Sequence, residues 1–87
     1  MYELTETNRD EIRREIANAL GIDPNHIPAL LTSEQTAVVL GVKPATLQNW
    51  RSLGRHRLRF VKVGRLPRYR VGDLVDWIAQ RTAGSAS

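Results

Sequence analysis

The 87-residue sequence contains no cysteine, so neither disulfide bonds nor thiolate metal sites can stabilise its fold. It has no apolar run that approaches the roughly 20 residues needed for a membrane-spanning helix. Its first residues lack the basic segment followed by an apolar segment that marks a secretory signal. We therefore expect one domain with a modest hydrophobic core, no contact with a membrane and a cytoplasmic location.

Acidic residues are scarce in the second half of the chain, although the net charge of the whole is only +4. Residues 1–40 carry three arginines against seven acids, a net charge of −4. Residues 41–87 carry ten Lys and Arg against Asp73 and Asp76, a net charge of +8. A basic half of this kind favours a polyanionic partner, of which nucleic acid is the commonest. Most of its basic residues are arginine, which suits forked contacts with phosphates.

Side-chain groupings that catalyse reactions or hold metals are also missing. The two histidines, His26 and His56, lie far apart in the sequence, and no glycine-rich phosphate loop or Ser/His/Asp arrangement is present. His26 is expected to be a solvated or capping residue rather than a metal ligand. The sequence therefore predicts a protein that is not an enzyme and that uses no metal or cofactor.

What the sequence does contain is a pair of short helices around a tight turn. Thr32 begins a capping box ahead of a helix over residues 33–40, and Gly41 stands where that helix ends. Pro44 suits the first position of a second helix, which ends before Gly54. This layout is that of a helix-turn-helix.

The second of these helices has a small, polar face opposite Leu47 and Trp50. At about 100° per residue, those two apolar side chains point toward the core. Gln and Asn can bond adenine through N6 and N7, and alanine can touch a thymine methyl group. An ordinary solvated helix face would also be polar, but the basic half of the chain favours base readout. The predicted base-reading residues are Ala45, Gln48, Asn49 and Ser52.

A β-hairpin is predicted after this helix, because residues 60–63 and 66–71 are rich in β-branched and aromatic residues. Arg65 lies in the turn between the two strands. We expect Val61 and Val63 to face the core, opposite Tyr69 and Val71. The basic side chains of the strands are expected to face outward. The predicted phosphate and wing contacts are Lys43, Thr46, Arg51, Arg55, Lys62, Arg65, Arg68 and Arg70.

A helix is also predicted at each end of the chain. Thr7 or Asn8 can cap the first one, which runs to about Leu20, and its apolar residues recur at helical spacing. Those residues are Ile12, Ile16, Ala19 and Leu20. This stripe can dock on the same domain, on a second copy or on another protein. The last helix is expected over residues 73–81. The expected core of the remaining chain is Leu30, Leu31, Ala37, Val38, Leu47, Trp50, Leu74, Trp77 and Ile78.

The segment LTSEQTAVVLGVKPATLQNW, followed by FVKVGR, RYR and DLVDWI, resembles the excisionase/MerR-like winged helix-turn-helix family. That family includes AlpA-like regulators and recombination directionality factors of mobile elements. The resemblance covers about residues 31–81, and one departure is Lys43, where the family commonly has a capping serine. It implies that the second helix enters the major groove. It also implies that the Arg65 ribbon reaches the adjacent minor groove, while Arg68 and Arg70 grip the backbone.

We therefore expect a mainly α fold with a small β-hairpin. Its parts are an N-terminal helix and loop over residues 1–30, a winged helix-turn-helix over 31–82 and a disordered tail over 83–87. The expected function is sequence-specific binding of double-stranded DNA, as a small transcription regulator of a phage or mobile element. An excisionase that assists a site-specific recombinase and a protein-interaction module are the alternatives. A homodimer or a cooperative array is compatible with the sequence, which leaves the oligomeric state and the target site open.

Overall fold

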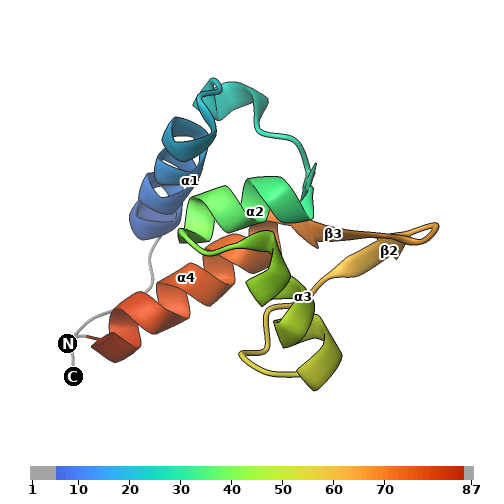
Figure 1. The fold of residues 1–87 in the computed structure, drawn as a ribbon. Coiled ribbons are helices and arrows are strands. Elements are labelled where there is room, and N and C mark those ends of the chain that lie inside the picture. The colour runs from blue at the N-terminus through green and yellow to red at the C-terminus, as the bar shows by residue number, and fades with distance from the viewer. Residues whose placement is uncertain (1–5, 86–87) are drawn as a thin grey trace.

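The structure, a computed structural model, describes residues 6–85 and the side chains of residues 8–81. Its elements in chain order are α1 (Glu6–Leu20), η1 (Pro24–His26), β1 (Leu30–Leu31), α2 (Ser33–Leu40), α3 (Pro44–Leu53), β2 (Val61–Val63), β3 (Leu66–Arg70) and α4 (Val71–Ser85) (Figure 1). The fold is mainly helical with a small antiparallel sheet, as predicted for a winged helix-turn-helix. Within residues 6–85, no helix combines the length and the apolar character that a membrane crossing requires.

Local capping interactions set the ends of α2 and α3 where the sequence predicted them. The backbone N–H of Gln35 donates to Thr32 Oγ1 at 3.0 Å, and the backbone N–H of Thr32 donates to Gln35 Oε1 at 3.0 Å. Gly41 and Gly54 end the two helices with φ angles of 69° and 63°, a left-handed conformation that glycine adopts without steric cost. Lys43 precedes α3 without a side-chain capping bond, so α3 begins on the fixed φ of its proline.

The sheet has the strand order β1-β3-β2, and β1 was not predicted from the sequence. β1 has only two residues, too few to show a strand periodicity, and it forms because Leu31 pairs with Tyr69 of β3. Leu31 is fully buried, whereas Leu30 is 37% exposed. The expectation that both leucines enter the core is therefore wrong for Leu30, because successive residues of a strand point to opposite faces.

The pairing of β2 with β3 differs from the expected one. The two-residue connection between the strands pairs Val63 with Leu66 and Val61 with Arg68. Val63 is 52% exposed, and the core position on the ribbon belongs to Tyr69, which is 1% exposed. The prediction that Val61 and Val63 face the core is therefore wrong, because a shift of register by an odd number of residues exchanges the two faces of a strand. Their expected partners Tyr69 and Val71 are buried, as predicted.

The core is formed by residues from all four helices, from β1 and β3, and from the segment before β2. Its buried apolar residues are Ile12, Ile16, Ala17, Leu31, Ala37, Leu47, Leu58, Tyr69, Val71, Leu74, Val75 and Ala79. Val38 was expected there but is 59% exposed, and Thr36 is fully buried instead. The Thr36 hydroxyl donates to the Thr32 carbonyl at 2.8 Å, which satisfies this buried polar group.

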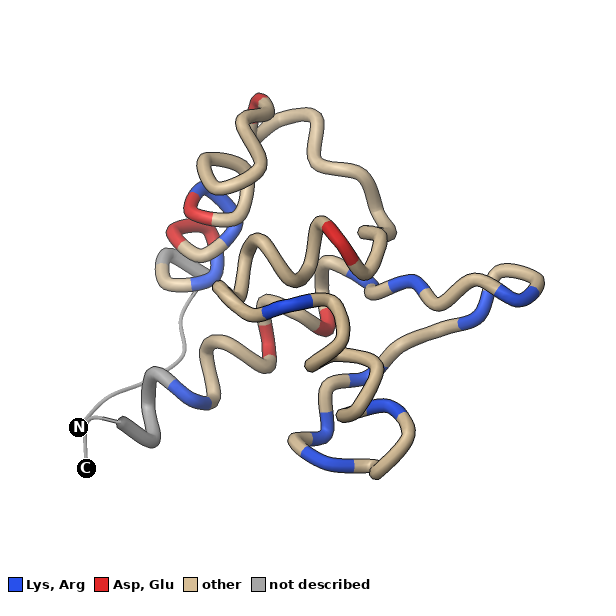
Figure 2. Tube along the Cα trace, viewed as in Figure 1, with Lys and Arg blue, Asp and Glu red and all other residues tan. Residues whose placement is uncertain are grey.

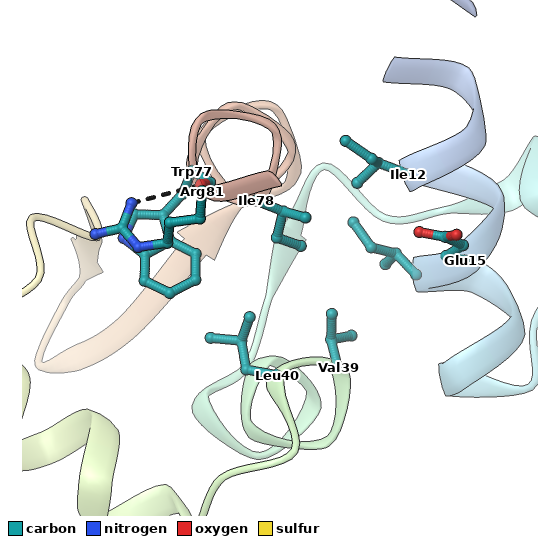
Figure 3. Close-up of a pocket in the computed structure, with 8 residues that line it drawn as sticks. Ile12, Glu15, Val39, Leu40, Trp77, Ile78 and Arg81 are labelled. Carbon is teal, nitrogen blue, oxygen red and sulfur yellow. Dashed lines mark hydrogen bonds between the residues drawn. The ribbon is translucent and has the colours of Figure 1, made fainter. Parts of the chain in front are cut away.

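α1 packs against α2 and α4, so the predicted apolar stripe docks on its own domain. Figure 3 shows Ile12 of α1, Val39 of α2 and Ile78 of α4 pointing into a cleft of about 430 Å³ between the three helices. An ion pair between Arg9 and Asp76 also joins α1 to α4. Ala17 rather than the expected Ala19 is buried, because the covered face of α1 is rotated from the predicted stripe toward Ala17 and away from Ala19.

Both terminal helices are longer than predicted. α1 begins at Glu6, so Thr7 and Asn8 lie inside the helix rather than at its cap, and residues 1–5 lie outside the described part of the chain. α4 begins at Val71 and continues to Ser85. The expected tail over residues 83–87 is therefore helical up to Ser85, and residues 86–87 lie outside the described part.

Candidate nucleic-acid interface

One side of the molecule carries basic residues without acidic ones. Residues 41–70 contain nine Lys and Arg and no Asp or Glu. Figure 2 shows these basic residues at the turn before α3, in the loop after α3 and along β2 and β3, whereas the acidic residues lie over α1, α2, α4 and the loop after α1. The helix-turn-helix and the ribbon therefore form a cationic surface, which suits a polyanion.

A hollow of about 430 Å³ lies between α3, the start of β3 and the N-terminus of α2. It brings together Ala45 and Gln48, which were predicted to read bases, with Arg51 and Arg68, which were predicted to contact phosphates. The N-cap residue of α2, Thr32, lines the same hollow together with the first two helical residues, Ser33 and Glu34. Sequence reasoning gave these three no place in the interface, because a capping signal locates a helix end without showing what lies next to it.

The polar face of α3 is open to solvent. Ala45, Gln48, Asn49 and Ser52 are all exposed, whereas Leu47 on the opposite side is fully buried. Ala45 and Gln48 line the hollow beside the ribbon, but Asn49 and Ser52 do not. The surface available to a ligand therefore extends from the ribbon side of α3 across the full width of its polar face.

Arg51 has an internal partner that the sequence did not reveal. Its Nη1 atom donates to the hydroxyl oxygen of Tyr69 at 2.6 Å and to Ser33 Oγ at 3.2 Å. Its guanidinium carbon also lies 5.8 Å from the ring centroid of Phe60. Arg51 therefore connects α3 to both β3 and α2, and its contacts hold α3 at a defined position against the ribbon.

The other predicted phosphate contacts are spread over the basic side rather than gathered in the hollow. Arg65 is exposed in the turn at the ribbon tip. Lys62 pairs with Pro67 and so lies on the opposite face of the ribbon from Arg68, whose Nη1 donates to the Pro67 carbonyl at 2.9 Å. Arg70 lies at the far end of β3 from the tip, beside β1.

Lys43 and Arg55 flank α3 at its two ends, and both are exposed. Thr46 is half-buried in the first turns of the same helix. None of these three residues lines the hollow. Together they place polar groups along the length of α3 rather than at one point.

Metal-binding groups are not brought together in the part of the chain that the structure describes. No cluster of three or more His, Cys, Asp or Glu occurs there. His26 Nδ1 lies 3.4 Å from Asp23 Oδ2, in an exposed pair at η1. The polar side chains that this surface presents are cations, hydroxyls and amides, which are able to bind a ligand by charge and hydrogen bonding.

Comparison with known families agrees with this geometry. A protein-family model described as a helix-turn-helix domain matches residues 30–82. The chain belongs to this helix-turn-helix domain family. Comparisons with curated proteins and with solved structures give no significant match. The matched span contains α2, α3 and the ribbon, and a helix-turn-helix domain indicates DNA binding.

Proposed function

We propose that this protein binds double-stranded DNA sequence-specifically, with α3 in the major groove and the β2–β3 ribbon at the adjacent minor groove. The observation that carries the proposal is the exposed polar face of α3, which shares one hollow with Arg68 of the ribbon. An α-helix with its side chains is about 10–12 Å across, so the major groove, about 12 Å wide, admits α3. Its ten residues give α3 a length of about 15 Å.

The contacts within the domain favour a preorganised interface. Arg51 connects α3 to Tyr69 and Ser33, so α3 and the ribbon keep a constant relative position when they meet DNA. Binding then costs little conformational entropy within the interface. Arg65 at the ribbon tip can enter a narrow minor groove, where arginine responds to groove width rather than to individual bases.

In keeping with the resemblance to AlpA-like regulators, we propose a role as a small transcription regulator of a mobile element. A reporter assay on the bound site measures that role directly. An excisionase would instead stimulate excision by a recombinase without changing the reporter.

A single domain of this size gains useful specificity from a second copy or a cooperative array. Selection of bound fragments from random duplexes tests the specificity and the number of copies bound, because the recovered motif shows both the sequence and the spacing of half-sites.

Replacing Gln48 or Asn49 with alanine is expected to reduce discrimination by about 1–3 kcal/mol at the base pair that each amide reads. The physical reason is the loss of a bidentate hydrogen bond to a base edge. Competition binding between the selected duplex and single-base variants measures the effect. Asn18→Ala is the matched control, because Asn18 is an exposed amide on α1, outside the basic side. Unchanged site preference in both Gln48→Ala and Asn49→Ala would refute the proposed reading face.

Replacing Arg65 with alanine is expected to weaken binding to every duplex and to reduce the slope of log K against log salt by about 0.9. That slope counts the phosphate charges neutralised in the complex. Titrations at several salt concentrations measure it, with Arg14→Ala as a control that removes the same charge from α1. A slope equal to that of Arg14→Ala would show that the ribbon tip does not touch DNA.

A further inference from the structure

The loop after α3 contains three arginines that alternate with two other residues. We call residues 55–59, with the sequence Arg-His-Arg-Leu-Arg, the arginine loop. His56 and Arg57 within it have φ angles of 66° and 51°. Such left-handed angles are disfavoured for residues that carry a Cβ atom, and two in succession persist only where the surrounding structure holds them.

The residues between the arginines are what hold the loop. The His56 carbonyl accepts hydrogen bonds from Trp77 Nε1 at 2.6 Å and from Arg81 Nη2 at 2.8 Å, both from α4. The His56 ring also lies 4.3 Å from the Trp50 ring, centroid to centroid. Leu58 is 9% exposed and belongs to the core. The loop is therefore attached to both α3 and α4 at its second and fourth positions.

The side chains of the three arginines are accessible to solvent and to a ligand. Arg55, Arg57 and Arg59 are all exposed, and none of the three side chains makes an ion pair or a hydrogen bond among the described residues. Arg57 and Arg59 also line a hollow of about 550 Å³ together with Arg70 of β3 and one carboxylate, that of Asp73. Three guanidinium groups against one carboxylate give this hollow a net positive charge, which favours an anion. On their α4 side, Arg57 and Arg59 line a second hollow with Asp73 and Asp76, of which Asp76 is already paired with Arg9.

We propose that Arg57 and Arg59, with Arg70 beside them, form a second phosphate-binding site that grips the DNA backbone near the C-terminal end of α3. This inference rests on the proposed DNA binding. It assigns a role to Arg57 and Arg59, which sequence reasoning left without one. Arg70 lines this hollow, whereas Arg68 lines the one beside the first half of α3.

The positions of the two cationic sites along α3 support this assignment. The ribbon residues Leu66–Arg68 share their hollow with Pro44, Ala45 and Gln48, in the first half of α3. The arginine loop instead follows the last turn of α3, and Figure 2 shows its basic residues beside that end of the helix, away from the ribbon tip. Cations at both ends of a helix about 15 Å long would contact phosphates of both DNA strands that border the groove in which the helix lies.

The test is a salt titration of the double variant Arg57→Gly/Arg59→Ala against the wild-type protein on one duplex. Glycine accepts the left-handed φ of position 57 without strain. We expect the slope of log K against log salt to fall by about 1.8, because two phosphate contacts are lost. We expect the ratio of affinities for selected and unrelated duplexes to stay the same. Arg13→Ala/Arg14→Ala removes two charges from α1 as the matched control, and a loop variant whose slope equals that of this control would overturn the inference.

Two further measurements keep the inference testable if the double variant folds poorly. Arg57→Lys/Arg59→Lys keeps both charges, so we expect the slope of log K against log salt to stay close to that of the wild-type protein. If this folded variant lost the full value of about 1.8 in slope, a phosphate contact would be contradicted. Ethylation interference on the wild-type protein should show blocked phosphates on both flanks of the site read by α3. Interference on one flank alone would overturn the inference.

Failure of this inference is separable from failure of the proposed function. If the wild-type protein binds no duplex at low salt, the proposed function fails and the arginine loop fails with it. If the wild-type protein binds and Gln48→Ala changes its site preference, the proposed function stands. A loop variant that then behaves like the α1 control removes the second phosphate-binding site alone.

Discussion

Replacing Leu47 with alanine is expected to lower the free energy of unfolding by about 2–5 kcal/mol. Leu47 is the buried residue of α3 and is fully shielded from solvent, whereas the rest of this helix is exposed or half-buried. Removing its side chain leaves a cavity where α3 joins the core, so α3 loses its main apolar attachment. Urea denaturation followed by circular dichroism measures the change.

The same helix offers a matched control for this prediction. Leu53→Ala removes the same atoms from a side chain that is 63% exposed, and its expected effect is within about 0.5 kcal/mol. Equal losses for Leu47→Ala and Leu53→Ala would contradict the burial on which the docking of α3 depends.

Replacing Trp77 with alanine is expected to cost about 3 kcal/mol, the low end of the range for large aromatic residues. The indole is half-buried rather than fully buried, but its contacts join three elements. Its ring centroid lies 5.9 Å from that of Trp50, and the guanidinium carbon of Arg81 lies 3.7 Å from it. Its Nε1 atom donates to the His56 carbonyl. Thermal and urea unfolding measure the loss.

Trp77→Phe separates packing from hydrogen bonding in this prediction. Phenylalanine keeps an aromatic ring and removes the N–H donor, while Arg81 still donates to the same His56 carbonyl. We expect a cost of about 1 kcal/mol for this change. If Trp77→Ala melted like the wild-type protein, the junction between α3, the arginine loop and α4 would contribute nothing to stability.

Much of the candidate site could be predicted because its signals are local. The polar face of α3 follows from the helical period once Leu47 is taken as the core direction, and the structure leaves that face exposed. The position of Arg65 follows from a turn between two strands. In each case the residues concerned lie within a few positions of one another in the chain.

Other parts of the site depend on partners that are distant in the sequence. Arg51 was expected to face phosphates, and its contacts with Tyr69 and Ser33 exist because β3 and α2 converge beside α3. The exposed Val38 and the buried Thr36 show the same limitation. In an eight-residue helix with several apolar side chains, periodicity cannot show which side the neighbouring elements will cover.

By itself, the sequence determined the bounds of α2 and α3, the order of helices and ribbon, and the charge of the binding side. Those properties come from caps, turns and composition, which act between near neighbours or need no geometry at all. Only the tertiary structure decided the register of the ribbon, the pairing of β1, the docking of α1 and the grouping of Arg57 and Arg59 with Arg70. Each of these is a contact between segments far apart in the chain, and its free energy depends on surfaces that exist only after the whole domain has folded.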